Sequence, residues 1–212
     1  MTSSKSPGAA KYVPQGATLP QLREAAQKCK GCELYRHATQ AVLGEGPRRA
    51  RILMVGEQPG DSEDREGRPF VGPAGRLLDQ LLKGAAISRA TVFVTNAVKH
   101  FRWEPRGKRR LHKRPELRHI KACNIWLVAE IAKHQPRVIV ALGATALRAL
   151  SGAASSIAAL RGKPFKHASG AAVVASYHPS AVLRADEPGA LEFKRQILED
   201  LKLARLLAGP DE

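Results

Sequence analysis

Four short apolar runs, separated by stretches of helical periodicity, constrain the fold of this chain more than any other feature. They cover residues 51–55 (RILMV), 91–95 (TVFVT), 138–142 (VIVAL) and 172–176 (AVVAS). Runs of this length and composition, bounded by turn residues, are typical of buried strands. Strands that alternate with helices indicate βαβ units. We therefore expect one α/β domain with a central, mainly parallel four-stranded sheet flanked by helices.

The helical stretches have recognisable beginnings and ends. Pro73 lies near the first position of one helix, where its missing N–H costs nothing, and Pro136 ends another. The expected helices cover residues 21–27, 73–82, 115–134, 144–150 and 188–207. Residues 1–18 are small, polar and punctuated by Pro and Gly, so we expect a flexible arm there and the folded domain at 19–212.

Composition narrows the function classes. The 212 residues include 35 Lys and Arg against 19 Asp and Glu, a formal net charge of +16, which points to a polyanionic partner. No apolar run approaches the ~20 residues that a membrane span needs, and no secretory signal is visible at the N-terminus. Three cysteines are an odd number for a disulfide framework. We expect a monomer in a reducing cytoplasm.

Chemistry-bearing residues follow the expected strands. In open α/β sheets, ligands bind beyond the carboxyl ends of the strands. The segments at those ends are GEQPGD (56–61), Asn96 with the basic stretch after it, GAT (143–145) and HPS (178–180). Because parallel strands end at one edge, we expect their acid, amide and imidazole groups to share a site there.

A basic stretch follows the second strand. Its ten cations are opposed only by Glu104 and Glu116, and Phe101 and Trp103 are interleaved with them. That mixture suits phosphate contact with stacking on bases or sugars, although a solvated loop without a partner has the same composition. The surrounding cations oppose protonation of His112, which favours a neutral, nucleophilic imidazole over a merely polar surface residue. The cations are Lys99, Arg102, Arg106, Lys108, Arg109, Arg110, Lys113, Arg114, Arg118 and Lys121.

The cysteines indicate a metal centre. Cys29 and Cys32 form a C-x-x-C pair, whose spacing lets two thiolates bind one centre, and Cys123 is the only other thiol. A fourth ligand is needed, and His100 and His119 are the candidates. A redox pair or inert buried thiols are the alternatives. Spacing alone does not separate zinc from an iron–sulfur cluster.

Four motifs occur in order along the chain: GEQPGD (56–61), GRPFVGPAG (67–75), TNAVKH (95–100) and HPS (178–180). Together they resemble the uracil-DNA glycosylase superfamily, nearest its iron–sulfur branch, family 4. The stretch KRRLHK (108–113) resembles a loop peculiar to the UdgX branch, whose members become covalently joined to uracil-containing DNA. The resemblance runs from about Gln27 into the last expected helix.

The resemblance implies a [4Fe-4S] cluster on Cys29, Cys32, His100 and Cys123, with zinc as the alternative metal. Family 4 proteins have cysteine at the position of His100, whereas UdgX-like proteins have histidine there. Leu111 stands where the UdgX pattern more often has isoleucine, which conserves volume.

The resemblance also implies a uracil pocket for a nucleotide that is flipped out or already single-stranded. Phe70 would stack on the extruded base, and the Asn96 amide would match its Watson–Crick edge. His178 would donate to a uracil oxygen as negative charge builds on the leaving base. Gln58 is counted with these substrate-binding residues. Apart from the resemblance, Phe70 reads as a core aromatic, Asn96 as a strand-end turn residue and the segment at His178 as a helix-entry turn.

The remaining assignments concern the sugar. A carboxylate stabilises the cationic C1′ that forms on bond cleavage, and Glu57 and Asp61 are unranked candidates, with helix capping as the alternative. In the UdgX reading His112 captures C1′, and Arg110 places the loop against phosphate or Glu57. We therefore expect a DNA-repair enzyme acting on uracil in single- or double-stranded DNA. The rivals are a multiple-turnover hydrolytic glycosylase and a non-catalytic, metal-stabilised DNA-binding protein.

Overall fold

A five-stranded sheet forms the centre of the molecule, whose computed structural model describes residues 8–210. Four parallel strands, β1 (Ile52–Gly56), β2 (Val92–Asn96), β5 (Val138–Leu142) and β7 (Ala172–Ser176), lie in the order β2-β1-β5-β7. The prediction of a mainly parallel α/β sheet is confirmed, and each of the four strands lies within one residue of its expected position. A fifth strand, β6 (Phe165–Lys166), pairs antiparallel with β7 and was not predicted.

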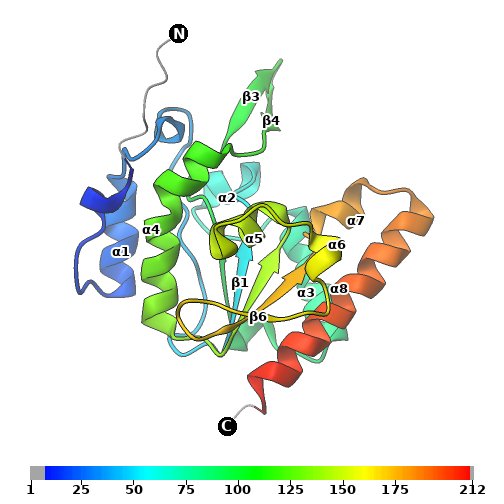
Figure 1. The fold of residues 1–212 in the computed structure, drawn as a ribbon. Helices are drawn as coiled ribbons and strands as arrows, with labels where there is room; N and C mark the ends of the chain where they lie inside the picture. Colours follow the sequence, from blue (N-terminus) through cyan, green and yellow to red (C-terminus); the bar gives the residue numbers. More distant parts are fainter. Residues whose placement is uncertain (1–7, 211–212) are drawn as a thin grey trace.

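Helices cover both faces of this sheet (Figure 1). On one face, α3 (Pro73–Gly84) and α8 (Glu187–Ala208) bury Met54, Val94 and Val140 of the strands. On the other, α4 (Leu117–His134), α5 (Ala144–Ser151) and α6 (Ile157–Leu160) bury the alternate strand residues, such as Leu53 and Ile139. Both faces being covered explains why the strands read as continuous apolar runs. Among the described residues, no helix is long and apolar enough to cross a membrane.

A third group of buried residues lies outside the sheet. It joins α1 (Leu19–Gln27), the segment after it and α4, and it contains all three cysteines. Of the expected arm at 1–18, residues 1–7 lie outside the described residues. Residues 8–18 differ from the expectation, because Ala9 and Ala17 are buried in this group and the Ala9 N–H donates to the Ala122 carbonyl over 2.9 Å. A 3-10 turn, η1 (Ala10–Tyr12), belongs to the same segment.

The basic stretch forms a β-hairpin that projects from the body of the molecule (Figure 1). Its strands are β3 (Trp103–Arg106) and β4 (Arg109–His112), paired antiparallel through a two-residue connection. Gly107 takes a φ of 57°, as the first position of a tight hairpin turn can require. The sequence predicted only a loop here, because charges and Pro105 replace the β-branched residues that mark a strand.

Short elements complete the strand ends. α2 (Asp61–Glu66) follows the loop after β1, and α7 (Ser180–Arg184) follows β7. Two further 3-10 turns are η2 (Glu33–Arg36), after the C-x-x-C segment, and η3 (Arg89–Thr91), before β2. The chain runs from β1 to β2 on one side and then to β5 on the other side of β1. The topological switch point therefore lies between β1 and β5, where such sheets bind ligands.

Candidate active site and candidate metal centre

Glu57 lies at the switch point, immediately after β1. Thr145, in the first turn of α5 after β5, donates its hydroxyl hydrogen to Glu57 Oε2. Arg114 Nε lies 3.7 Å from the same oxygen and 3.3 Å from the Thr145 hydroxyl. These contacts fix the position of Glu57 Oε2 at the carboxyl ends of β1 and β5. The other oxygen, Oε1, is left facing the hairpin.

Gln58 fastens the base of the hairpin. Its Oε1 accepts the N–H of Arg102 over 3.1 Å, and its Nε2 donates to the carbonyls of Arg102 and Lys113, each over 3.1 Å. These bonds fix which end of the amide carries the hydrogens. Gln58 Nε2 also lies 3.0 Å from Nε2 of His112. An amide nitrogen does not accept, so this contact is a hydrogen bond only in the tautomer whose Nε2 carries the lone pair, with one of the two amide hydrogens shared between His112 and a carbonyl.

The hairpin brings His112 beside Glu57. Nε2 of His112 lies 3.6 Å from Glu57 Oε1, and 48% of the His112 side chain is exposed. Partial burial lowers the pKa of His112, the charge of Arg184 acts in the same direction, and Glu57 opposes both. A pKa below the ordinary value of 6.5 favours the neutral ring at physiological pH. A neutral imidazole in this position is able to act as a nucleophile.

His178 faces the site from the far side, at the entry to α7. Its Nδ1 accepts from the Ser180 N–H over 3.1 Å and lies 2.8 Å from the Ser180 hydroxyl. Burial lowers the pKa of His178 to about 4, and the charges of Arg184 and His112 contribute in the same direction. A neutral ring with an occupied Nδ1 carries its hydrogen on Nε2. His178 is thus set to donate from Nε2.

Phe70 and Asn96 form the remaining walls. The ring of Phe70 is stacked with that of His178 at a centroid distance of 6.1 Å. Phe70 has a φ of 58°, a left-handed conformation that is strained for an aromatic residue. Asn96 is 3% exposed at the end of β2, and its side chain lies against Gly56, where an added Cβ would clash with Asn96 Oδ1 and with the Phe70 ring. Gly56 therefore lets an aromatic face and an amide approach each other.

Asp61 and Arg110 lie apart from this group. Asp61 is the first residue of α2, its side chain is 44% exposed, and it pairs with Arg65 and Arg110. Arg110 also binds Asp64 over 2.6 Å and packs on the rings of Phe101 and Trp103. Arg110 was expected to place the loop against phosphate or Glu57. The Glu57 alternative is wrong, because the carboxylates of α2 pair with its guanidinium, and contact with phosphate stays a prediction. Glu57, not Asp61, lies beside His112.

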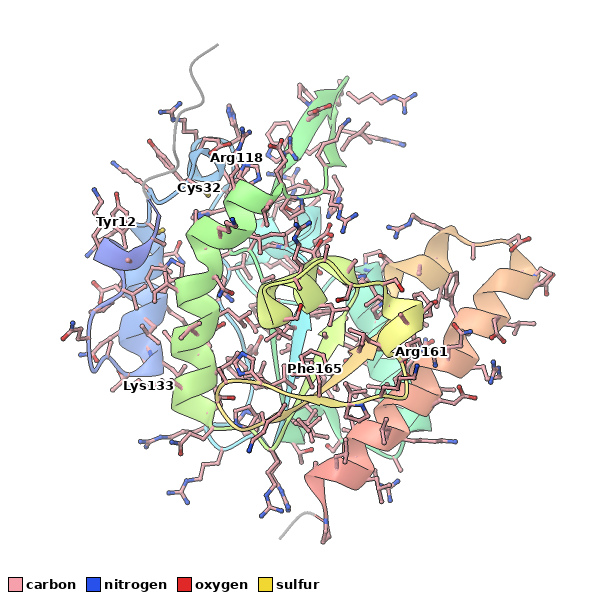
Figure 2. The ribbon with its side chains drawn as sticks, in the orientation of Figure 1. Tyr12, Cys32, Arg118, Lys133, Arg161 and Phe165 are labelled. Carbon is pink, nitrogen blue, oxygen red and sulfur yellow. The ribbon has the colours of Figure 1, made fainter. Side chains whose placement is uncertain are left out.

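The three cysteines lie in one buried group of residues. All three thiols are free and buried, and the charges of Cys29 and Cys32 both act on Cys123. The Lys99 N–H donates to Cys123 Sγ over 3.2 Å, and Trp126 Nε1 donates to Cys29 Sγ over 3.4 Å. Figure 2 shows Cys32 in the segment after α1, near the first turns of α4 that carry Arg118. Burial raises the pKa of Cys32 to about 11 and that of Cys123 to about 12.

The two histidine candidates differ in their contacts. His119 is engaged at both ring nitrogens, since Nδ1 accepts the Glu116 N–H over 2.9 Å and Nε2 lies 2.7 Å from Glu33 Oε1. His100 is 5% exposed, burial lowers its pKa to about 4, and its ring makes no hydrogen bond within residues 8–210. A neutral imidazole without another partner is the form that binds metal.

Donor chemistry at this centre fits an iron–sulfur cluster. Three buried thiols with N–H donors to sulfur, and a nearby buried imidazole, are the ligand types that such clusters use. In the part of the chain that the structure describes, no three His, Cys, Asp or Glu side chains converge on a point where they could hold one metal ion. A cluster takes each ligand on a different iron atom, so its ligands do not have to converge in that way.

Sequence reasoning missed several residues that shape the site. Thr145 was flagged only as part of a strand-end segment, and the rule that ligands gather at strand ends could have singled it out. Asp64 is fully buried and holds Arg110, and Glu63 accepts the N–H groups of Gly60 over 3.0 Å and Gly72 over 2.8 Å. Neither carboxylate has a sequence signal apart from its place in an acidic turn.

The sequence of this chain is similar to those of known proteins. A family model described as "Uracil DNA glycosylase superfamily" matches residues 43–202. The chain is 41% identical to the Type-4 uracil-DNA glycosylase of Thermotoga maritima, over 87% of this chain and 91% of that protein. It is 37% identical to the Type-4 uracil-DNA glycosylase of Sulfurisphaera tokodaii, over 90% and 85% respectively. A Type-5 uracil-DNA glycosylase of Pyrobaculum aerophilum is 33% identical, over 76% and 75%.

Proposed function

The chain belongs to the uracil DNA glycosylase superfamily, and we propose that it excises uracil from DNA in repair and is then captured covalently on the deoxyribose through His112. The excision step is supported by the Type-4 relatives and by the group formed by Glu57, Phe70, Asn96 and His178. The capture step rests on one observation. His112 Nε2 lies 3.6 Å from Glu57 Oε1 and 3.0 Å from the amide nitrogen of Gln58, a donor that favours the tautomer with a lone pair on Nε2.

Recognition of the base follows from the pocket walls. A uracil flipped out of the stack lies on the face of Phe70, with its Watson–Crick edge toward the Asn96 amide. That amide both donates and accepts, as uracil requires, whereas cytosine presents the reverse pattern. His178 donates from Nε2 to a uracil oxygen. Because its pKa is lowered to about 4, it stays a neutral donor in the whole physiological range.

Cleavage of the glycosidic bond leaves negative charge on the base and positive charge on the sugar. The bond between the base nitrogen and C1′ breaks, its electron pair stays on uracil, and C1′ becomes cationic. The hydrogen bond from His178 Nε2 strengthens as charge builds on the base. Glu57, held by Thr145, supplies the opposite charge beside the sugar. The leaving uracil anion then takes a proton from solvent.

Capture uses the lone pair of His112. Nε2 leaves its contact with Gln58 and forms a bond to C1′, which makes the ring a cationic alkylimidazolium. Glu57 Oε1 neighbours that charge and stabilises it. An alkylated imidazole is a poor leaving group, so each protein molecule acts once. In the rival reaction a water molecule attacks C1′ and the enzyme turns over.

A denaturing gel tests this proposal. The protein is mixed with a single-stranded oligonucleotide that contains one uracil, beside a thymine control. We expect a uracil-dependent band that survives heat and detergent with the wild type and is missing with H112A. Free oligonucleotide that breaks at the uracil position under alkali, without that band, would establish the hydrolytic reaction. Intact, unshifted DNA would leave the non-catalytic binding protein.

We also propose that Cys29, Cys32, His100 and Cys123 hold a [4Fe-4S] cluster. When bound, it joins the segment after α1 to the end of β2 and to α4, which is a structural role. Purified protein should then show broad visible absorption and contain iron. Colourless protein that contains zinc would overturn this assignment. A His100→Cys variant, which restores the family 4 ligand, should keep the absorption, whereas Cys123→Ala should lose it.

A further inference from the structure

Lys99 and Glu130 form an ion pair in the interior, between the uracil pocket and the cysteines. Nζ of Lys99 lies 2.7 Å from Glu130 Oε2, and each side chain is only 1% exposed. Desolvation of two charges usually cancels most of what their attraction contributes, so a buried pair is weak evidence of a stabilising role. The contacts of this pair indicate another role.

Every hydrogen of the Lys99 ammonium has a partner. Besides Glu130, Nζ donates to the Thr95 hydroxyl over 2.7 Å and to the carbonyl oxygen of Asn96 over 2.5 Å. Glu130 is equally saturated, because Oε2 also accepts from the Thr95 hydroxyl over 2.8 Å and Oε1 accepts the Gly44 N–H over 2.6 Å. The ion pair therefore holds Thr95 and Asn96, the last two residues of β2, in place.

The direction of the Asn96 side chain depends on contacts of this kind with its backbone. Within residues 8–210 its side-chain amide makes no hydrogen bond. Its direction therefore depends on where the backbone holds it. The next two residues are bound to the end of β1 and the residue after it: the Ala97 N–H donates to the Gly56 carbonyl over 2.9 Å, and the Val98 N–H to the Glu57 carbonyl over 3.1 Å. At Asn96 itself, the carbonyl is held by Lys99.

We propose that Lys99 is a positioning residue for base recognition, whose grip on the Asn96 carbonyl aims the Asn96 amide at the uracil edge. The inference rests on the proposed excision of uracil. Glu130 keeps the ammonium in place and has no direct part in recognition. Removal of Lys99 should therefore impair excision even in a protein that stays folded and still binds DNA.

Two variants separate positioning from stability. In K99M/E130Q, the methionine side chain fills the volume of the lysine and the new amide still bonds Gly44 and Thr95, so no charge is left unpaired. In E130Q alone, Lys99 keeps its bond to Asn96, but the buried ammonium loses its counter-charge. We expect E130Q to be the less stable of the two and the more active.

The measurements are thermal unfolding, single-turnover release of uracil and the Kd for a thymine oligonucleotide. We expect uracil release by K99M/E130Q to fall about tenfold to a hundredfold, the scale of a misaimed reacting group, with the Kd within about twofold of wild type. The control D79N/R89Q removes an ion pair at the opposite end of β2 and should match wild type in uracil release. If E130Q does not fold, uracil release by K99M/E130Q, compared with wild type and with D79N/R89Q, still tests the positioning role.

Other outcomes refute distinct statements. Equal rates for K99M/E130Q and wild type, or rates that follow the order of stability across the variants, overturn the positioning role. A wild-type protein that releases no uracil overturns the proposed function itself.

Discussion

Thr145, in the first turn of α5, contacts Glu57, whose carboxylate we propose to stabilise the cationic sugar. Its side chain is buried, and its hydroxyl is the donor that holds Glu57 Oε2. Thr145→Val keeps the volume and removes this bond. A hydrogen bond to a charged group contributes about 1.5–3 kcal/mol, so we expect uracil release to slow about tenfold or more. Single-turnover release at saturating protein measures it.

Thr145→Ser is the matched control, because it restores the hydroxyl in a smaller side chain. It should recover most of the wild-type rate. A Thr145→Val protein that releases uracil as fast as wild type would show that Arg114 alone holds the carboxylate.

His178 makes stability depend on pH. Its pKa is about 4 in the folded protein, against an ordinary value of 6.5. The unfolded chain therefore binds a proton at His178 that the folded chain does not, and stability falls as pH drops from about 6.5 toward 4. The loss is at most about 3 kcal/mol. Denaturant unfolding at pH 7 and pH 4.5 should show a smaller difference for His178→Asn than for wild type.

The sequence alone could not decide which of two carboxylates lies in the site. Glu57 and Asp61 lie in one turn, and nothing in their spacing distinguishes them. The structure does, because Asp61 begins α2 and meets two arginines, whereas Glu57 lies between Thr145 and His112. Partners that come from distant segments of the chain decide the role of each carboxylate, and no local pattern reports them.

The β3–β4 hairpin is an element that local sequence patterns did not predict. Continuous apolar runs predicted the four central strands because each of these strands is buried on both faces. β3 and β4 bury little, so they lack that pattern. Their placement depends instead on Arg110, which is 14% exposed and reaches Asp61 and the fully buried Asp64. A polar contact with α2, 46 residues away, thus does for the hairpin what apolar burial does for the sheet.

Loosening this contact should affect capture more than excision. Arg110→Lys replaces a planar fork by a single ammonium, which cannot bind both carboxylates of α2 in the same way. We expect the covalent band to fall about tenfold relative to released uracil, because His112 is carried by β4 whereas the base pocket is not. Denaturing gels and uracil release from the same samples measure the ratio. Arg109 is exposed and has no ion pair within residues 8–210, so Arg109→Lys should leave the ratio unchanged; a loss there too would contradict the anchoring role.

At the scale of the whole molecule, the sheet places the proposed chemistry and the charge determines the approach of DNA. Sequence order alone predicted that loops at the carboxyl ends of the strands would meet. It did not predict that the base of a hairpin would bring His112 to that edge. Figure 2 shows long side chains projecting from the hairpin. Arg106, Lys108 and Arg109 are exposed there, as is Arg184 on α7, and none of them has an ion pair within the described residues.

These four cations predict how binding depends on salt. Each phosphate contact on single-stranded DNA contributes about −0.7 to the slope of log K against log salt, so four contacts give about −2.8. Between roughly 50 and 200 mM salt the Kd should then rise about fiftyfold. H112A is the protein to use, because covalent capture would hide the equilibrium, and the wild-type adduct should resist the same salt. Neutralising Arg106 and Arg109 should flatten the slope by about 1.4. An unchanged slope would place the DNA backbone away from the hairpin and leave His112 without a route to the sugar.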